Sequence, residues 1–138
     1  MARREHSLKE LRAKLKAKGI APELIDTVTT RLANEGLQSD QRFTESYLHS
    51  RIQKGYGPSR LEQELYERGI DEQLVQSCLE NLAIDWMEIL ASVRSKKFRQ
   101  ALPVGYSEQA RESRFLQYRG FTTEQIRHFY KNKKNDDE

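Results

Sequence analysis

Apolar residues recur along this chain at spacings of three and four, as Leu8, Leu11 and Leu15 do, and this spacing is typical of amphipathic helices. No run of alternating β-branched residues appears, so the pattern predicts an all-α fold without a sheet. Caps, glycines and prolines predict eight helices. The first four run from a cap at Ser7 to about Lys18, from Pro22 to Asn34, from Ser39 or Asp40 to Gly55, and from Pro58 to Gly69. Of the last four, one begins at a cap at Asp71, one runs from Asp85 to about Gln100, one runs from a cap at Ser107 to Gly120, and one begins near Thr123.

A helix–glycine–helix pattern occurs three times, around Gly19, Gly69 and Gly120, at intervals of fifty and fifty-one residues. Aligning the glycines also aligns a leucine four residues before each glycine, namely Leu15, Leu65 and Leu116. It likewise aligns the apolar residue directly after each glycine, namely Ile20, Ile70 and Phe121. A glycine followed by an apolar residue is typical of a Schellman helix end. The fixed period therefore predicts tandem copies of one helical unit.

Grouping by this period predicts an incomplete first repeat of two helices at residues 1–36, three-helix repeats at 37–83 and 84–134, and a frayed tail at 135–138. Apolar residues make up 36% of the chain and charged residues 33%. This composition predicts a small hydrophobic core. A small core suits repeats in which each unit buries one apolar stripe against its neighbour, so we expect the repeats to form an elongated, curved stack.

The charges are unevenly distributed along the sequence. Residues 1–20 have seven Lys or Arg against two Glu, residues 21–93 have six against thirteen acidic residues, and residues 94–138 have eleven against six. The basic ends favour a polyanionic partner and the acidic middle repels one. Ordinary solvated helix faces remain an alternative explanation.

No set of residues predicts catalysis, a metal site or a cofactor. His6, His49 and His128 fall in different repeats, and Cys78 has no basic neighbour in sequence that would lower the pKa of its thiol. The turn at Gly55-Tyr-Gly-Pro58 is interpreted as a connector, because no preceding strand and no Lys-Ser/Thr pair supports a phosphate loop. Five tyrosines could stack on bases, although half-buried packing is preferred for them: Tyr56, Tyr66, Tyr106, Tyr118 and Tyr130.

No secretion signal or membrane span is expected, and the single cysteine fits a reducing compartment. We therefore expect a cytoplasmic protein that has no membrane partner and no small-molecule substrate.

Four stretches resemble the bacterial RecX family of recombination regulators. They are Arg3-Arg-Glu-His-Ser-Leu-Lys-Glu-Leu11, Tyr47 to Arg51 followed by Gly55-Tyr-Gly-Pro58, Leu65-Tyr-Glu-Arg-Gly-Ile70, and Arg114-Phe-Leu-Gln-Tyr-Arg-Gly-Phe121. The resemblance implies tandem three-helix repeats. It also implies a non-enzymatic protein that binds the RecA filament on single-stranded DNA and suppresses strand exchange, ATP hydrolysis and LexA cleavage, and hence recombination and the SOS response. Double-stranded DNA is a further candidate partner.

Family members usually carry one more helix before the stretch that begins at Arg3, so the apolar stripe from Leu8 to Leu15 is expected to be partly exposed. On this interpretation, the residues expected to face the DNA in the filament are Arg4, Lys9, Arg12, Lys16, Arg94, Lys96, Lys97, Arg99, Arg111, Arg114, Arg119 and Arg127. The alternative function is a stand-alone DNA-binding protein that uses its repeats as helix-turn-helix-like units.

Overall fold

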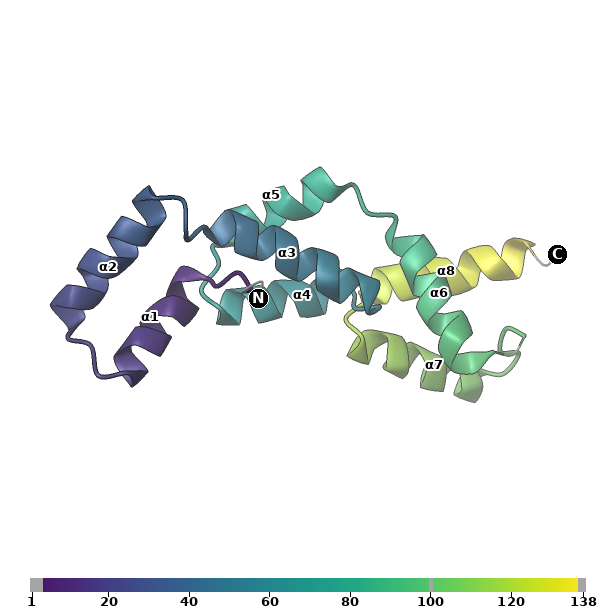
Figure 1. Ribbon diagram of the computed structural model, residues 1–138. Helices are drawn as coiled ribbons and strands as arrows, with labels where there is room; N and C mark the ends of the chain where they lie inside the picture. The colour runs from purple at the N-terminus through teal and green to yellow at the C-terminus, as the bar shows by residue number, and fades with distance from the viewer. Residues whose placement is uncertain (1–3, 100, 137–138) are drawn as a thin grey trace. The chain divides into compact units, whose positions relative to one another are not determined.

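The computed structural model describes residues 4–99 and 101–136, and this part of the chain contains eight α-helices and no strand (Figure 1). The helices are α1 (Leu8–Ala17), α2 (Pro22–Asn34), α3 (Asp40–Gln53), α4 (Pro58–Glu67), α5 (Glu72–Leu82), α6 (Trp86–Phe98), α7 (Tyr106–Tyr118) and α8 (Thr123–Asp136). The predicted all-α class is confirmed. No helix in the described ranges has both the length and the apolar character to span a bilayer.

The three aligned glycines end α1, α4 and α7 with the same hydrogen bonds. The N–H of the residue after each glycine donates to the carbonyl of the leucine four residues before that glycine, at 3.2 Å for Ile20, 3.0 Å for Ile70 and 3.1 Å for Phe121. Gly69 has a φ of 80°, which a residue with a Cβ adopts only with strain. Gly36 and Gly55 end α2 and α3 in the same way, with the Leu37 N–H donating to the Leu32 carbonyl at 2.8 Å and the Tyr56 N–H donating to the Arg51 carbonyl at 3.2 Å. This helix end therefore recurs in the described chain and is not confined to the three aligned glycines.

Side-chain caps fix the starts of several helices. Ser7 and Glu10 form the expected capping box at α1, and Thr122 and Gln125 form a second one before α8. The cap expected at Ser107 is wrong: α7 begins one residue earlier, at Tyr106, and its N-cap is Gly105, which has no side chain to accept a bond.

Two other expected helix ends differ from the structure in detail. Helix α6 ends at Phe98, and Gln100, where the end was expected, lies outside the described residues. Helix α8 continues to Asp136, two residues into the expected tail, of which 137–138 are also outside the described part.

The chain divides into two compact units. Unit 1 comprises Met1–His49 and Glu64–Leu82, and unit 2 comprises Ser50–Gln63 and Ala83–Glu138. The division does not follow the repeats, because the turn between α3 and α4 belongs to unit 2.

In unit 1, α1 packs along α2 (Figure 1). Polar contacts tie the start of α1 to later helices: the Leu8 N–H donates to the Asp40 carboxylate at 2.7 Å, and Lys9 Nζ donates to the Glu67 carbonyl at 3.0 Å. Leu8, Leu11 and Leu15 are half-buried. The core of the unit is formed by Ile25, Phe43, Leu48, Leu65, Ile70, Val75 and Cys78.

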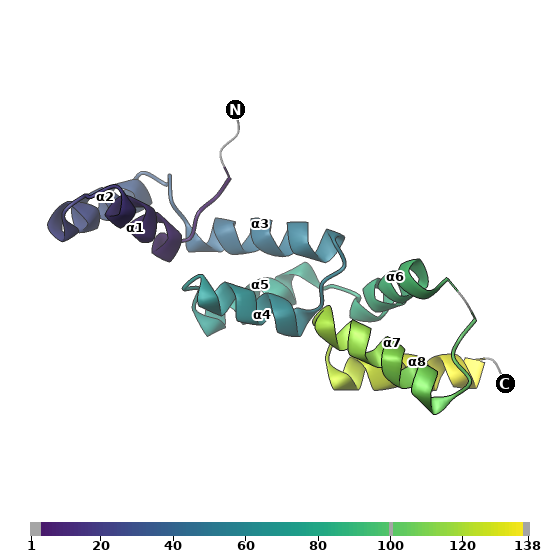
Figure 2. The same cartoon turned by 90° about the horizontal axis from the view of Figure 1, so that it is seen from below.

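In unit 2, each of α6, α7 and α8 packs against the other two (Figures 1 and 2). Their shared core consists of Leu90, Leu116, Phe121, Ile126, Phe129 and Tyr130. Leu116 and Phe121 are among the positions that the aligned repeats predict to be apolar. This core fixes which face of α7 is turned outward, and that face carries the candidate site.

Candidate nucleic-acid interface

One face of α7 alternates cationic and aromatic side chains. Arg111 and Arg114 lie one turn before Phe115 and Tyr118 respectively, and Arg119 follows at the end of the helix. Residues three and four apart share a helix face, so these five side chains lie on one side of α7 while Leu116 is in the core.

Cation–π contacts extend this face across unit 2 into a continuous series. Lys97 Nζ and Arg119 Cζ each lie 5.4 Å from the centre of the Phe115 ring, and Arg119 Cζ lies 5.0 Å from the centre of the Tyr56 ring. Arg60 Cζ is 4.6 Å from the Tyr56 ring and 5.1 Å from the Tyr118 ring. We call these six residues, Lys97, Phe115, Arg119, Tyr56, Arg60 and Tyr118, the cation–aromatic strip.

Backbone bonds between two turns hold the strip together. The Gly57 N–H donates to the Arg119 carbonyl at 2.8 Å, and the Ser59 N–H donates to the Gly120 carbonyl at 2.9 Å. A Cβ on Gly57 would lie 2.5 Å from the Gly120 carbonyl carbon, and a Cβ on Gly120 would lie 2.4 Å from that of Arg60. The turn Gly55-Tyr-Gly-Pro58 is thus a connector, as expected, and it also docks against the end of α7.

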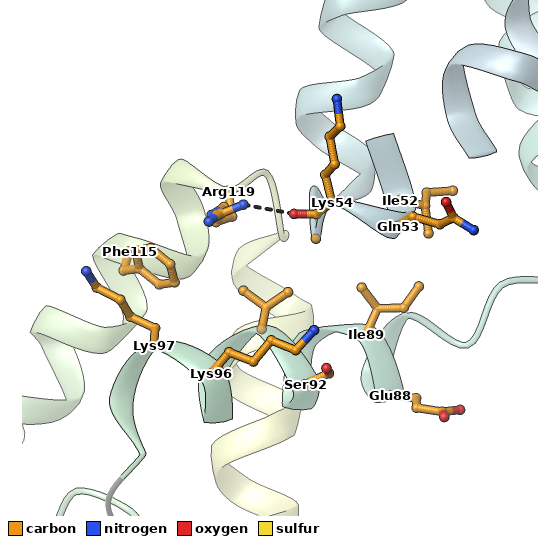
Figure 3. A pocket seen from close by; sticks show the side chains of 12 residues that line it. Ile52, Gln53, Lys54, Glu88, Ile89, Ser92, Lys96, Lys97, Phe115 and Arg119 are labelled. Carbon is orange, nitrogen blue, oxygen red and sulfur yellow. Dashed lines mark hydrogen bonds between the residues drawn. The ribbon is translucent and has the colours of Figure 1, made fainter. Parts of the chain in front are cut away.

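A pocket of about 440 Å³ opens beside the strip, between the end of α3, the outer side of α6 and the end of α7 (Figure 3). Its lining carries four cations, Lys54, Lys96, Lys97 and Arg119. The Arg119 guanidinium donates to the Lys54 carbonyl at 3.1 Å, which fixes its position at the pocket (Figure 3). Cations at helix C-termini are stabilised by the helix dipole, so the fold can hold these like charges close together.

Arg94 does not belong to this surface, and the expectation that it faces DNA is wrong. Its side chain is 6% exposed, and its Nε and one terminal nitrogen donate to the two carboxylate oxygens of Glu112 at 2.9 and 3.0 Å. Tyr130 donates to the same carboxylate at 2.6 Å. The guanidinium therefore neutralises a buried acid and is not available to a polyanion.

These contacts shift the pKa values of the buried groups. Burial by itself would raise the pKa of Glu112, but the hydrogen bonds from Arg94 and Tyr130 outweigh it and hold this pKa below its usual value. Burial, followed by the hydrogen bond to Glu112, raises the pKa of Tyr130. Both shifts keep the ion pair charged and the phenol neutral near pH 7.

The remaining expected residues are scattered. Arg127 lines a separate groove with Gln109, Ser113 and Gln117, and Arg99 is exposed at the C-terminal cap of α6.

The expected residues of the first repeat are all exposed in unit 1. Three of them already have partners there: Arg4 contacts Glu10, Arg12 contacts Asp26, and Lys9 contacts the Glu67 carbonyl. The structure thus places Lys96, Lys97 and Arg119 around one pocket, with Arg111 and Arg114 on the same face of α7 as Arg119. Arg94 is buried, and Arg127 lines another groove.

Three family models match consecutive parts of the sequence. They describe the first, second and third three-helix domains of RecX and match residues 1–32, 39–79 and 84–130. The chain belongs to the RecX family. Tandem helical repeats of the RecX type are therefore its architecture.

Individual relatives agree with this assignment. "Regulatory protein RecX" of Pseudomonas savastanoi pv. phaseolicola is 42% identical over 99% of this chain and 88% of its own length. The protein of the same name from Halorhodospira halophila is 39% identical over 92% of this chain and 79% of its own length. These names give this RecX-family chain a regulatory role.

Two crystal structures share the fold. RecX from Lactobacillus salivarius superposes with a TM-score of 0.77 at 20% identity, covering 94% of this chain and 86% of its own. A second structure, of a regulatory protein RecX, superposes with a TM-score of 0.79 at 18% identity. The superposition covers 93% of this chain and 64% of the chain in that structure.

Sequence reasoning missed several residues at or beside the candidate site. Lys54, Arg51 and Arg60 lie in the stretch that the charge count treats as acidic, yet Arg51 Cζ is 3.8 Å from the centre of the Tyr56 ring. The preference for half-buried tyrosines is wrong at Tyr118, whose exposure is 71%. The three- and four-residue spacing of cations and rings in α7 was the available signal.

The same preference is also wrong at Tyr106, which is 89% exposed, and at Tyr130, whose hydroxyl is buried against Glu112.

The site offers electrostatic binding and stacking. Clustered lysines and arginines attract phosphates, and exposed aromatic rings stack on unpaired bases, a combination found in proteins that bind single strands. Within residues 4–99 and 101–136, no three His, Cys, Asp or Glu side chains come together as metal ligands would.

Proposed function

We propose that this protein modulates RecA by binding the RecA–DNA filament, and that it acts by contact rather than by catalysis. RecX-family membership supports a regulatory role, and the single observation that carries the proposal further is the cation–aromatic strip beside a four-cation pocket. Its partners would be the RecA filament and the DNA within it, and its compartment the cytoplasm, where both are found.

In this proposal the strip, together with Lys96 of the adjoining pocket, contacts the exposed strand of the filament. Lys96, Lys97 and Arg119 neutralise phosphates, and the exposed ring of Tyr118 stacks on a base. Arg111 and Arg114 extend the phosphate contacts along α7. The first repeat has fewer cations available for this purpose, because Arg4, Lys9 and Arg12 already have partners within unit 1.

The test measures ATP turnover by a pre-formed RecA filament at a substoichiometric dose of the protein. We expect the wild type to slow turnover and Lys96→Ala/Lys97→Ala to lose most of this effect. Lys14→Ala/Lys18→Ala removes the same charge from exposed positions in unit 1, and it should retain the effect. Equal inhibition by both double variants at physiological salt would show that the strip does not contact the filament.

The runner-up function, a stand-alone DNA-binding protein, predicts a different dependence on RecA. Binding to RecA filaments is compared with binding to naked single- and double-stranded DNA across a salt series. A filament modulator needs RecA for tight binding, whereas a groove reader binds naked duplex with a sequence preference. Tight, sequence-selective duplex binding without RecA would favour the runner-up.

A further inference from the structure

Four cations contribute to the lining of the pocket beside the strip, and the ammonium groups of Lys54, Lys96 and Lys97 point in different directions (Figure 3). Of its lining residues, four are cationic, Lys54, Lys96, Lys97 and Arg119, and one is acidic, Glu88. Glu88 precedes Lys97 by nine residues on α6, so about 13 Å of helix separates their backbone positions. The part of the pocket between the ends of α3, α6 and α7 therefore has no carboxylate in its lining to balance the cations.

The walls between these cations are apolar. Ile52, Ile89 and Phe115 contribute to the lining, with Ser92 as a hydroxyl group among them (Figure 3). Val93 also lines the pocket. Apolar walls lower the local dielectric constant, which strengthens the attraction between the cations and an anion that enters. The volume of the pocket falls in the range of ordinary small-ligand sites.

We propose that this pocket binds a short chain of linked phosphates, as carried by a nucleoside triphosphate or by inorganic polyphosphate. Phosphates that share bridging oxygens place three or four negative charges within the space of one small ligand. In a nucleic-acid strand each phosphate carries one charge, and a sugar separates it from the next. Lysine side chains are flexible, so Lys54, Lys96 and Lys97 can turn toward a ligand held beside Arg119. Linked phosphates therefore match the cations that line this pocket better than a strand does.

Occupation of the pocket has a consequence for the strip. Lys97 and Arg119 belong to both, because each lines the pocket and each lies beside the Phe115 ring. A bound polyphosphate neutralises these two cations and so weakens the attraction of the strip for nucleic acid. The pocket thus makes the surface sensitive to the free polyphosphate concentration. This inference goes beyond the proposed function, since the binding itself needs neither RecA nor DNA.

The test is isothermal titration calorimetry on the full chain with tripolyphosphate, ATP, AMP and inorganic phosphate at about 0.15 M salt. We expect tripolyphosphate and ATP to saturate at one molecule per chain. The affinity for AMP and for phosphate should be lower by a factor of about ten or more. Equal affinity for tripolyphosphate and ATP assigns recognition to the phosphates alone, and tighter ATP binding assigns the site to a nucleotide. Absence of saturable binding of both overturns the proposal.

Variants separate a site from general charge attraction. Lys54 and Lys96 are exposed, so Lys54→Ala/Lys96→Ala leaves the core intact and should weaken tripolyphosphate binding about tenfold. Lys14→Ala/Lys18→Ala carries the same change in net charge and should leave the affinity within about twofold. Equal weakening by the two pairs overturns the pocket assignment. Thermal unfolding followed by circular dichroism checks that each variant is folded, and Lys96→Ala alone serves as a milder second variant.

Discussion

At the scale of single residues, the most consequential contact is the buried Arg94–Glu112 pair with the Tyr130 hydroxyl. The pair sits in the core that joins α6, α7 and α8, where an unpartnered charge would be costly. Its three side chains come one from each helix, so the network also fixes their mutual orientation. Arg94 therefore contributes to folding, although Lys96 and Lys97, two and three residues later, are exposed cations.

Glu112→Gln should destabilise the protein and reduce the dependence of its unfolding free energy on pH in the acid range. Loss of the buried carboxylate leaves the charge of Arg94 without its counterion and costs about 3 kcal/mol of unfolding free energy at pH 7. Because the folded-state pKa of Glu112 is lowered, its contribution is complete above the unfolded pKa of about 4.3 and is lost as pH falls through the folded value. Urea unfolding from about pH 7 to 3 measures this.

The exposed Glu108→Gln on the same helix is the control for this experiment, and it should change stability little. A wild type and a Glu112→Gln variant with parallel pH profiles would contradict the assignment.

Gly57 and Gly120 form the closest backbone approach in the site. Gly57→Ala places a methyl group 2.5 Å from the Gly120 carbonyl carbon, and relieving this overlap should cost about 2–3 kcal/mol. At Gly105 nothing lies within 4 Å of a built Cβ, so Gly105→Ala should be nearly neutral. Chemical denaturation of the two variants compares them directly. Equal stability would show that the two turns do not dock as described.

At the scale of helices, the chain uses one set of end signals repeatedly. Schellman bonds close α1, α4 and α7, and capping boxes open α1 and α8. These bonds satisfy backbone groups that the helix itself leaves unpaired, and the backbone N–H groups and side chains that supply them lie within about one turn of the helix end. Local sequence is therefore enough to place most of the boundaries.

Ser7→Ala should remove one such signal. Ser7 is buried and accepts the Glu10 N–H at 3.1 Å, so its loss should cost about 1 kcal/mol and fray the start of α1. Amide hydrogen exchange in α1 and the urea midpoint both report this. Ser77→Ala, at an exposed position inside α5, is the matched control and should be neutral or slightly stabilising. Unchanged protection of α1 in Ser7→Ala would contradict the role of the cap.

At the scale of the whole molecule, the modest net charge does not reflect a local concentration of cations in unit 2. The chain carries a net charge of +3, but the pocket lining alone has four cations and one carboxylate. Binding through such a surface releases counterions from a nucleic acid and is therefore strongly salt-dependent. The salt dependence measures how many phosphates the surface contacts.

Lys96→Ala/Lys97→Ala should reduce the slope of log Kobs against log salt for single-stranded DNA, or for the DNA in a RecA filament, by about 1.4. Fluorescence anisotropy with a labelled strand across a salt series gives this slope. Lys14→Ala/Lys18→Ala is the charge-matched comparison and should leave it unchanged. A slope reduced equally by both pairs would mean that binding does not distinguish the strip from the rest of the surface.

The sequence by itself determined the helices, their repeat and the family, because apolar spacing, glycines and caps act within a few residues of one another. It did not determine which cations share a surface. Arg94 and Lys96 are two residues apart, yet packing against Glu112 buries the first and leaves the second exposed. Lys54 reaches the site only because the α3–α4 turn docks on the end of α7. Such neighbourhoods depend on contacts between residues more than fifty positions apart, and only tertiary packing decides them.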